Sequence, residues 1–378
     1  MSNSRLRIAA LEPYAAVSHL AFLDGLTRHS VHDIRSFTLP PRYWKWRMRT
    51  ASVHFAAELA KAEPFDLLLA SDYLNLAELR ALLPTPQRNT PCVVYFHENQ
   101  LSYPLQKGES RDVHHALTHL HAILCSARAV FNSEYHRSTF LGHLELLLRR
   151  IPDVAMGASL EQVREKSCVL PIGTDLPAIA PGPESRSGGP PRILWNHRWE
   201  YDKDPERFLE ALGQLDRQGV DFRLVLLGQS FRAAPNRVQE LLEAIAHRIE
   251  ASGFLEERGA YVEALRSSDI VCSTARHEFF GIGTLEALRC GCLPLLPDDL
   301  AYPELLPELS TETDVHRGNI LYQPRASFAA ALASTIDAAK RGLWMEMRQR
   351  IVEGTERFRW ETLAPRYDEL LATAGRSD

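Results

Sequence analysis

HEFFGIGTLEAL, residues 277–288, is the most informative segment of this chain. Two glutamates eight positions apart, Glu278 and Glu286, bracket a glycine-containing turn. The pattern predicts a helix that runs from Ile282 to a glycine stop at Gly291. The free N–H groups and positive dipole end of such a helix favour an anion such as a diphosphate. Glu286 can then accept hydrogen bonds from a ribose, and Glu278 from sugar hydroxyls. The alternative is an ordinary turn with a surface glutamate on each side.

A second polar segment, WNHRWEYDKDP at residues 195–205, follows a predicted strand and precedes a predicted helix. We predict that Arg198 and Lys203 in this segment bind phosphate, because arginine offers a planar fork of donors and lysine a mobile charge. The alternative is that both are solvated loop cations. No acidic pair suited to bridging a divalent ion stands out, so we expect the two cations to neutralise a leaving nucleotide diphosphate without a metal or other cofactor.

Short apolar runs alternate with helical stretches along most of the chain, which predicts an α/β protein whose parallel strands are buried on both faces. A Pro-, Gly- and Ser-rich segment interrupts this alternation, which restarts directly after it. With 378 residues, the chain is also longer than one hydrophobic core usually spans. We therefore expect two doubly wound, Rossmann-like domains facing a central cleft. Their expected limits are residues 1–176 for the first domain, 177–191 for the linker, 192–356 for the second domain, and 357–378 for a C-terminal helix that packs back on the first.

The charge balance excludes some classes of protein. With 43 Lys and Arg against 48 Asp and Glu, the net charge is −5. This argues against nucleic-acid binding over the whole surface and leaves room for a local basic patch. No apolar run is long enough to span a bilayer, and the first residues lack the apolar core of a signal peptide, so we expect a cytoplasmic protein with no membrane partner. The six cysteines are few and scattered, so we expect reduced thiols.

Ligands of doubly wound sheets bind beyond the carboxyl ends of the strands, so polar residues after each apolar run are candidates for the site. In the first half they include His97, which opens the run HENQ at residues 97–100. We expect Ser71 and Asp72, by contrast, to cap a helix that begins near Leu74. Four histidines within eight residues predict a polar, half-exposed helix face rather than a metal site. They are His114, His115, His119 and His121.

Residues 40–49, PPRYWKWRMR, interleave four basic residues with three aromatic ones in a protein of negative net charge. This alternation offers phosphate contacts together with flat surfaces for unstacked bases, the combination with which proteins recognise single-stranded RNA loops. The alternative is an amphipathic edge whose aromatic rings turn inward while its cations are solvated.

The two polar segments, the linker and LPIGTD at residues 170–175 resemble those of the retaining glycosyltransferases of the GT-B fold, family 4. The resemblance implies that the glutamate segment holds the donor sugar and ribose and that the basic pair holds the diphosphate. The second domain would then bind the nucleotide sugar, and the first domain would lie on the acceptor side.

A narrower resemblance, to the tRNA-queuosine mannosyltransferases, lies mainly in the first domain. Its motifs are VYFHENQLSYP at 94–104, LPPRYWKWRMRT at 39–50, Glu12-Pro13-Tyr14 with Ser18-His19, and Tyr302-Pro303-Glu304. Enzymes of this family move mannose from GDP-mannose onto the cyclopentenediol of queuosine in the anticodon of tRNA(Asp). The resemblance therefore implies a nucleotide sugar and a queuosine-containing tRNA as partners. Where the family carries a Gly-Gly pair after the first strand, this chain has Ala15-Ala16-Val17, whose side chains would change how closely the backbone approaches the donor.

We expect front-face transfer with retention, in which a β-phosphate oxygen of the leaving GDP takes the acceptor's proton. The implied catalytic residues are His97, Glu278, Arg198 and Lys203. The implied donor-binding residues are Ser18, Phe280, Gly281, Ile282 and Glu286, and the implied tRNA-binding residues are Trp44, Lys45, Arg47, Arg49, Asn99 and Gln100. Alanine in place of Glu278 or Lys203 is expected to abolish transfer and to leave the fold intact.

Two alternatives remain open. One is a family 4 enzyme that uses another nucleotide sugar on a small-molecule or lipid-linked acceptor. The other belongs to a different class: a nucleotide-sugar epimerase or a binding protein without catalytic activity.

Overall fold

The computed structural model describes residues 5–105, 108, 110–176, 189–228, 235–306, 320–343 and 345–376. The chain divides into two compact units. Unit 1 comprises Met1–Asp175 and Phe358–Asp378, and unit 2 comprises Leu176–Arg357. Most of the expected linker, residues 177–188, lies outside the described residues.

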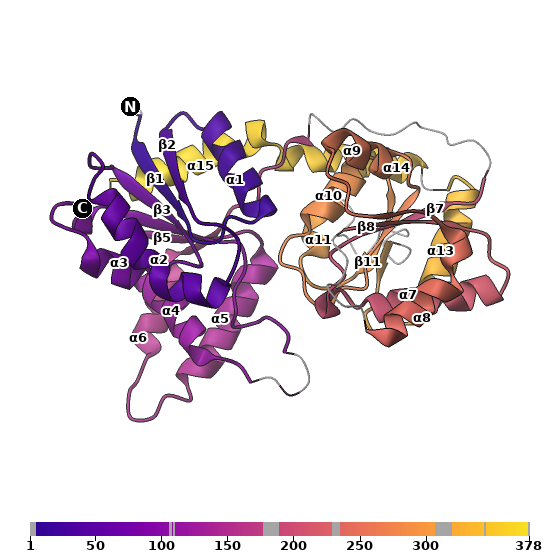
Figure 1. The fold of residues 1–378 in the computed structure, drawn as a ribbon, viewed down its shortest axis with the longest axis horizontal. Coiled ribbons are helices and arrows are strands. Elements are labelled where there is room, and N and C mark those ends of the chain that lie inside the picture. The colour runs from indigo at the N-terminus through magenta and orange to yellow at the C-terminus, as the bar shows by residue number, and fades with distance from the viewer. Residues whose placement is uncertain are drawn as a thin grey trace. The chain divides into compact units, whose positions relative to one another are not determined.

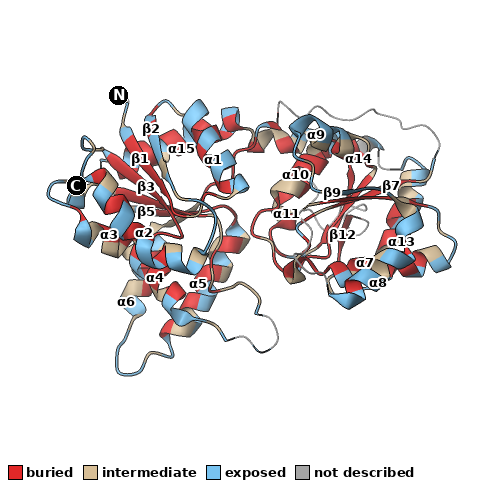
Figure 2. Ribbon diagram, viewed as in Figure 1, coloured by how far each residue is buried: buried red, intermediate tan, exposed pale blue. Residues whose placement is uncertain are grey.

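Unit 1 is built on a six-stranded parallel sheet with the order β2-β1-β3-β4-β5-β6 (Figure 1). Its strands are β1 (Arg7–Glu12), β2 (Asp33–Thr38), β3 (Leu67–Ser71), β4 (Cys92–Phe96), β5 (Arg128–Phe131) and β6 (Ser167–Val169). The apolar runs of β3 and β4 are buried at every position, as strands covered on both faces must be (Figure 2). The strand order reverses between β1 and β3. Doubly wound sheets bind their ligands beyond the carboxyl ends of the strands at such a reversal.

Helices cover both faces of this sheet (Figure 1). They are α1 (Val17–His29), α2 (Trp44–Leu59), α3 (Leu76–Leu82), α4 (Val113–Cys125), α5 (Glu134–Leu148), α6 (Gly157–Lys166) and the C-terminal α15 (Trp360–Ala374). The cap of α3 is Asn75, whose side chain accepts from the Glu78 N–H. The expectation that Ser71 and Asp72 cap this helix is therefore wrong, because the helix begins too late in the chain.

The C-terminal helix α15 packs on α1 and β4 of unit 1. Its first residue, Trp360, is 2% exposed. A Cβ at Gly25 would lie 2.0 Å from the Trp360 ring, and one at Gly173 would lie 2.4 Å from it. The hydroxyl of Tyr367 donates to the Pro171 carbonyl at 2.8 Å. The absence of side chains at the two glycines thus makes room for the indole that anchors the last helix.

The histidines of α4 do not form one polar face. His114 and His121 are exposed, but His115 and His119 are buried. The ring of His119 packs against Phe96 with centroids 5.3 Å apart, and burial lowers the pKa of His119 to about 3. The expectation of a half-exposed face is therefore wrong for His115 and His119, because their side of α4 faces the core.

Unit 2 repeats the architecture with a six-stranded parallel sheet in the order β12-β11-β10-β7-β8-β9. Its strands are β7 (Arg192–Asn196), β8 (Arg223–Leu227), β9 (Ile249–Gly253), β10 (Ile270–Cys272), β11 (Leu293–Pro297) and β12 (Leu321–Tyr322). In the described part of the chain its α-helices are α7 (Pro205–Arg217), α8 (Asn236–Ala244), α9 (Arg258–Arg266), α10 (Ile282–Arg289), α11 (Tyr302–Leu305), α13 (Phe328–Lys340) and α14 (Met345–Gly354). The two parallel sheets with their helices confirm the expected α/β fold class.

The strand order of unit 2 reverses between β7 and β10. The segment with Arg198 and Lys203 follows β7, and the segment with Glu278 follows β10. The topology therefore brings the two motifs of the second half to the ligand-binding edge of one sheet.

Candidate active site

The glycine turn between the two glutamates begins α10, which starts at Ile282 as the sequence predicts. Gly281 precedes the helix with φ +90°, a left-handed conformation that favours glycine. Gly283 touches the end of β7: a Cβ there would lie 2.9 Å from Nδ2 of Asn196. That amide donates to the Gly283 carbonyl at 3.1 Å. The start of α10 is thus held at the point where the strand order reverses.

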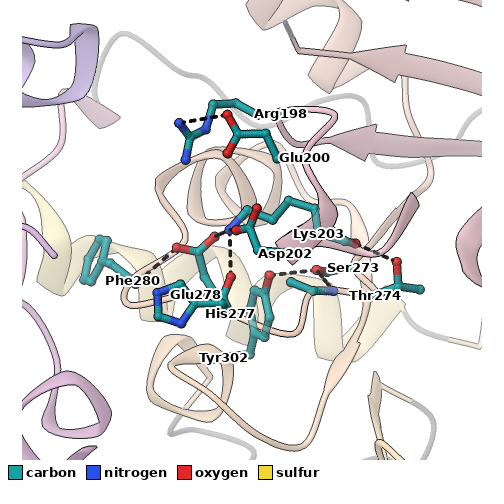
Figure 3. A network of polar contacts seen from close by, with 11 residues as sticks. Arg198, Glu200, Asp202, Lys203, Ser273, Thr274, His277, Glu278, Phe280 and Tyr302 are labelled. Carbon is teal, nitrogen blue, oxygen red and sulfur yellow. Dashed lines mark hydrogen bonds and ion pairs between the residues drawn. The ribbon is translucent and has the colours of Figure 1, made fainter. Parts of the chain in front are cut away.

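Lys203 is the centre of a polar network in unit 2 (Figure 3). Its ammonium donates to the His277 carbonyl at 2.7 Å and lies 3.1 Å from Oδ2 of Asp202 and 3.3 Å from Oε2 of Glu278. The side chain is only 9% exposed. Burial opposes the charge of Lys203, but the two carboxylates outweigh it and raise the pKa above its ordinary value. Lys203 is therefore a buried, fixed charge rather than a solvated loop cation.

Glu278 is the anionic partner in this network. Burial by itself would raise the pKa of its carboxyl. The neighbouring positive charge of Lys203 outweighs burial, and the pKa is lowered from 4.5 to about 2. The second oxygen, Oε1, accepts from the backbone N–H of Phe280 at 3.4 Å. The site thus holds an anion and a cation side by side, which suits a sugar hydroxyl next to a phosphate oxygen.

Glu286, one turn into α10, is held by two residues of α9. Arg258 donates to Oε1 at 2.6 Å, and the hydroxyl of Tyr261 donates to Oε2 at 2.6 Å. Asn196 in turn donates to the Tyr261 hydroxyl at 2.7 Å. Arg258 and Tyr261 were not predicted from the sequence, because no motif links them to a glutamate more than twenty positions away.

The other predicted donor-site residues of unit 2 lie around this network. The Arg198 side chain is 55% exposed and 3.3 Å from the carboxylate of Glu200 (Figure 3). Phe280 is buried and Ile282 is half-buried. Arg198 is therefore a surface cation, unlike the buried Lys203.

Two residues that the sequence analysis did not assign to the site belong to this network. Asp202 is 1% exposed and faces the Lys203 ammonium. Tyr302 is fully buried, and its hydroxyl lies 2.7 Å from Oγ of Ser273 (Figure 3). The sequence carried a signal for Tyr302, which lies in a motif of the resembled family, but none that sets Asp202 apart from other loop residues.

At the corresponding edge of unit 1, Glu12 at the end of β1 holds His19 of α1, with 3.1 Å between Oε2 and Nδ1. His97, which follows β4, stacks on His19 with ring centroids 4.0 Å apart. Burial and the neighbouring His19 lower the pKa of His97 well below its ordinary value. Burial also lowers the pKa of His19, but Glu12 outweighs it and raises the pKa. The two stacked rings are thus tuned in opposite directions, and His97 is neutral.

Glu12, His19 and His97 also form the one group among the described residues whose ligand atoms are close enough to hold a metal ion, within 4.8 Å of one another. The ring geometry argues against a shared ion. A metal lies in the plane of each imidazole that binds it, whereas these rings are stacked at only 17° to each other. Glu12 also accepts from the Tyr14 N–H at 2.8 Å and from Oγ of Ser71 at 3.1 Å. The group is a hydrogen-bonded array.

The predicted residues near His97 differ in exposure. Asn99 is fully buried, and its Oδ1 accepts from two following backbone N–H groups at 3.0 and 2.9 Å, so it shapes the turn. Gln100 is half-buried and donates to Glu98 at 3.0 Å. Ser18 is exposed in the first turn of α1.

The predicted tRNA-binding residues of the aromatic segment lie in the first turns of α2. Lys45 and Arg49 are exposed, whereas Trp44 and Arg47 are half-buried. The ring of Trp44 packs against His115 with centroids 5.0 Å apart. The structure thus separates a packed and an exposed side of this segment.

Comparison with known proteins shows which family combines these features. Residues 7–174 match the family model of the tRNA-queuosine alpha-mannosyltransferase N-terminal region, and residues 181–357 match that of the group 1 glycosyl transferases. A tRNA-queuosine alpha-mannosyltransferase of Drosophila melanogaster is 34% identical over 317 residues, which is 82% of this chain and 84% of the relative. The chain belongs to the tRNA-queuosine alpha-mannosyltransferase family. It is therefore a glycosyltransferase, and the resemblance to this family that the sequence motifs indicated is confirmed.

More distant similarities concern part of the chain or its fold alone. A GDP-mannose-dependent alpha-(1-6)-phosphatidylinositol dimannoside mannosyltransferase of Mycobacterium tuberculosis is 31% identical over 144 residues, 36% of this chain and 37% of the relative. The sucrose-phosphate synthase structure from Thermosynechococcus elongatus has a TM-score of 0.73 at 16% identity and covers 97% of this chain and 98% of its own, which supports the fold. No helix in the described part of the chain combines the length and apolar character that crossing a bilayer requires.

Proposed function

We propose that this protein transfers mannose from GDP-mannose, with retention, onto the cyclopentenediol of queuosine in the anticodon of tRNA(Asp). The observation that carries the proposal is the buried Lys203–Glu278 pair in a family member, next to the glycine turn that begins α10. The mannose of GDP-mannose is α-linked, so an α-mannoside product requires retention. A tRNA acceptor also implies a cytoplasmic location.

In this mechanism the protein stabilises the charge of the departing GDP. Lys203, Arg198 and the first N–H groups of α10 interact with the diphosphate as the bond to the sugar breaks. The acceptor hydroxyl forms the new bond on the same face of the sugar and gives its proton to a β-phosphate oxygen of GDP. We propose that the reaction needs no metal ion, because these cations supply the positive charge.

The remaining residues orient the substrates. Glu278 is proposed to hold a sugar hydroxyl and Glu286 the ribose, with Ser18 and the segment Phe280–Ile282 as further donor contacts. Neutral His97 of unit 1 is proposed to contact the transferred sugar. Asn99 is buried, so we propose that it positions the loop after His97 rather than touching tRNA.

The test measures GDP release and mannose incorporation with queuosine-containing tRNA(Asp), using GDP-mannose or UDP-glucose as donor. Arg198→Ala removes an exposed diphosphate contact without disturbing the core, and it should lower kcat/KM with GDP-mannose by about 100-fold. The matched control is Arg237→Ala, an arginine of unit 2 with 52% side-chain exposure, which should match the parent. Binding of GDP-mannose without GDP release in the presence of this tRNA would contradict the proposal and indicate a binding protein. Epimerised sugar nucleotide would contradict it in favour of an epimerase.

A further inference from the structure

The outer side of α2 displays aromatic rings and cations together. Tyr43, just before the helix, is 73% exposed, and Trp46 in its first turn is 70% exposed. Arg42, Lys45 and Arg49 are exposed beside them. We call these five residues the α2 face. Between Pro40 and Ala57 the sequence contains no acidic residue, although the protein as a whole is negatively charged.

The opposite side of α2 anchors the helix in unit 1. Met48 and Phe55 are each 1% exposed within the core. Trp44 is half-buried and packs against His115 and, with centroids 6.4 Å apart, against Tyr73. Two tryptophans two positions apart thus have different environments. Trp44 anchors the helix to unit 1, whereas Trp46 lies exposed at the surface.

Two features of the α2 face oppose folding, which indicates a role other than stability. Tyr43 has φ 56° and ψ 49°, a left-handed conformation that costs free energy for a tyrosine, and its side chain makes no capping hydrogen bond in return. The cations occupy the first turns of α2, where the positive end of the helix dipole disfavours them, and the first turn contains no acidic residue.

We infer that the α2 face binds an unpaired RNA loop, with Tyr43 and Trp46 stacking on its bases and Arg42, Lys45 and Arg49 contacting its phosphates. The inference rests on the proposed function and deepens it, because it assigns stacking to Tyr43 and Trp46 and a packing role to Trp44. Isolated rings flanked by cations suit separate bases along a strand. An amphipathic membrane helix would need a continuous apolar side. In the described structure the exposed large apolar residues of α2 are Trp46 and Val53, which do not form such a side.

The first arm of the experiment removes the rings. Tyr43→Gly with Trp46→Ala should weaken binding of a queuosine-containing anticodon stem–loop by about 30-fold, the effect of two lost stacks at the low end of their range. The slope of affinity against salt should be unchanged. Glycine adopts a φ of 56° freely, so the variant should keep the parent's unfolding temperature or exceed it. Phe254→Ala, which removes an exposed ring from unit 2, is the matched control and should bind like the parent.

The second arm removes the charges. Lys45→Ala with Arg49→Ala should flatten the salt dependence by about 1.4 in log–log slope, measured between about 50 and 200 mM salt. The same assays are run with vesicles of phosphatidylcholine and phosphatidylserine in equal parts. Tight vesicle binding that depends on Tyr43 and Trp46, without RNA binding, overturns the inference in favour of a lipid surface.

The outcomes also separate this inference from the proposed function. Parental RNA affinity in the Tyr43→Gly/Trp46→Ala protein overturns the inference, even if the parent transfers mannose to tRNA normally. RNA binding that is lost in this variant supports the inference, even if the parent transfers no mannose and the proposed function fails.

Discussion

Replacing Lys203 by methionine should destabilise unit 2 as well as impair transfer. The side chain is 9% exposed, and its ammonium is surrounded by the His277 carbonyl and the carboxylates of Asp202 and Glu278. Methionine keeps the bulk but leaves two buried acids without their cation. The sequence alone predicts an intact fold after removal of Lys203, and the burial of this residue changes that expectation.

The pKa of Glu278 gives the magnitude. It is lowered from 4.5 to about 2, although burial alone would raise it. Each pKa unit corresponds to about 1.4 kcal/mol, so the shift corresponds to about 3 kcal/mol of folding free energy. Because the folded-state pKa is the lower one, this contribution is present above pH 4.5 and is lost as the pH falls towards about 2. In Lys203→Met burial acts on Glu278 with much less opposition, so the pKa should rise above 4.5.

The assay is urea unfolding of the full chain at neutral pH and in steps down to about pH 3, with deuterium exchange of peptides from β7 and β10 to report unit 2. The variant should be less stable by about 3 kcal/mol at neutral pH, and the difference should shrink as the pH falls below about 5. Lys61→Met is the control, because Lys61 forms an exposed ion pair with Glu58 in unit 1 and its removal should leave unit 2 unchanged. A stability difference that stays constant over this pH range would refute the reasoning.

Two further changes test unit 1. Glu12→Gln should lower the pKa of His19 below its ordinary value, since burial then acts with less opposition. In the parent Glu12 raises this pKa, so the pair stabilises the fold when His19 is protonated. The stability lost in the variant should therefore be largest below pH 6.5 and smaller above it. Histidine NMR titration checks the shift, and an unchanged His19 pKa would contradict the assigned pair. Gly173→Ala should cost about 1–3 kcal/mol, because its Cβ would overlap the Trp360 ring, and should speed deuterium exchange in α15. Exchange as slow as in the parent would show that the indole can move aside.

The elements that the sequence predicts well are those set by local pattern. The start of α10 at Ile282 follows from glycine before an apolar periodic stretch, and the runs that became β3 and β4 are apolar apart from Ser71 at the end of β3. Likewise, topology brings the segments of Arg198 and Glu278 together because both follow parallel strands of one sheet.

Burial set by distant residues was not predictable in the same way. The spacing of His115 and His119 on one side of α4 is the same whether that side meets water or a core, and the choice depends on partners such as Trp44 and Phe96. The role of Asp202 was hidden for the same reason, since its sequence position suggests a loop and only the fold buries it against Lys203.

Both units place a buried acidic side chain against a basic one where the strand order reverses: Glu278 with Lys203 in unit 2, and Glu12 with His19 in unit 1. Such pairs contribute little to stability compared with apolar residues of the same volume, because burial removes both ions from water. In the proposed mechanism their value lies in function. The desolvation of Lys203 and Glu278 occurs when the chain folds, so the diphosphate and sugar proposed to bind there would meet charges that are already oriented and need only exchange partners with them. This proposed role accounts for the presence of ionisable groups at these positions in a fold built from apolar strands.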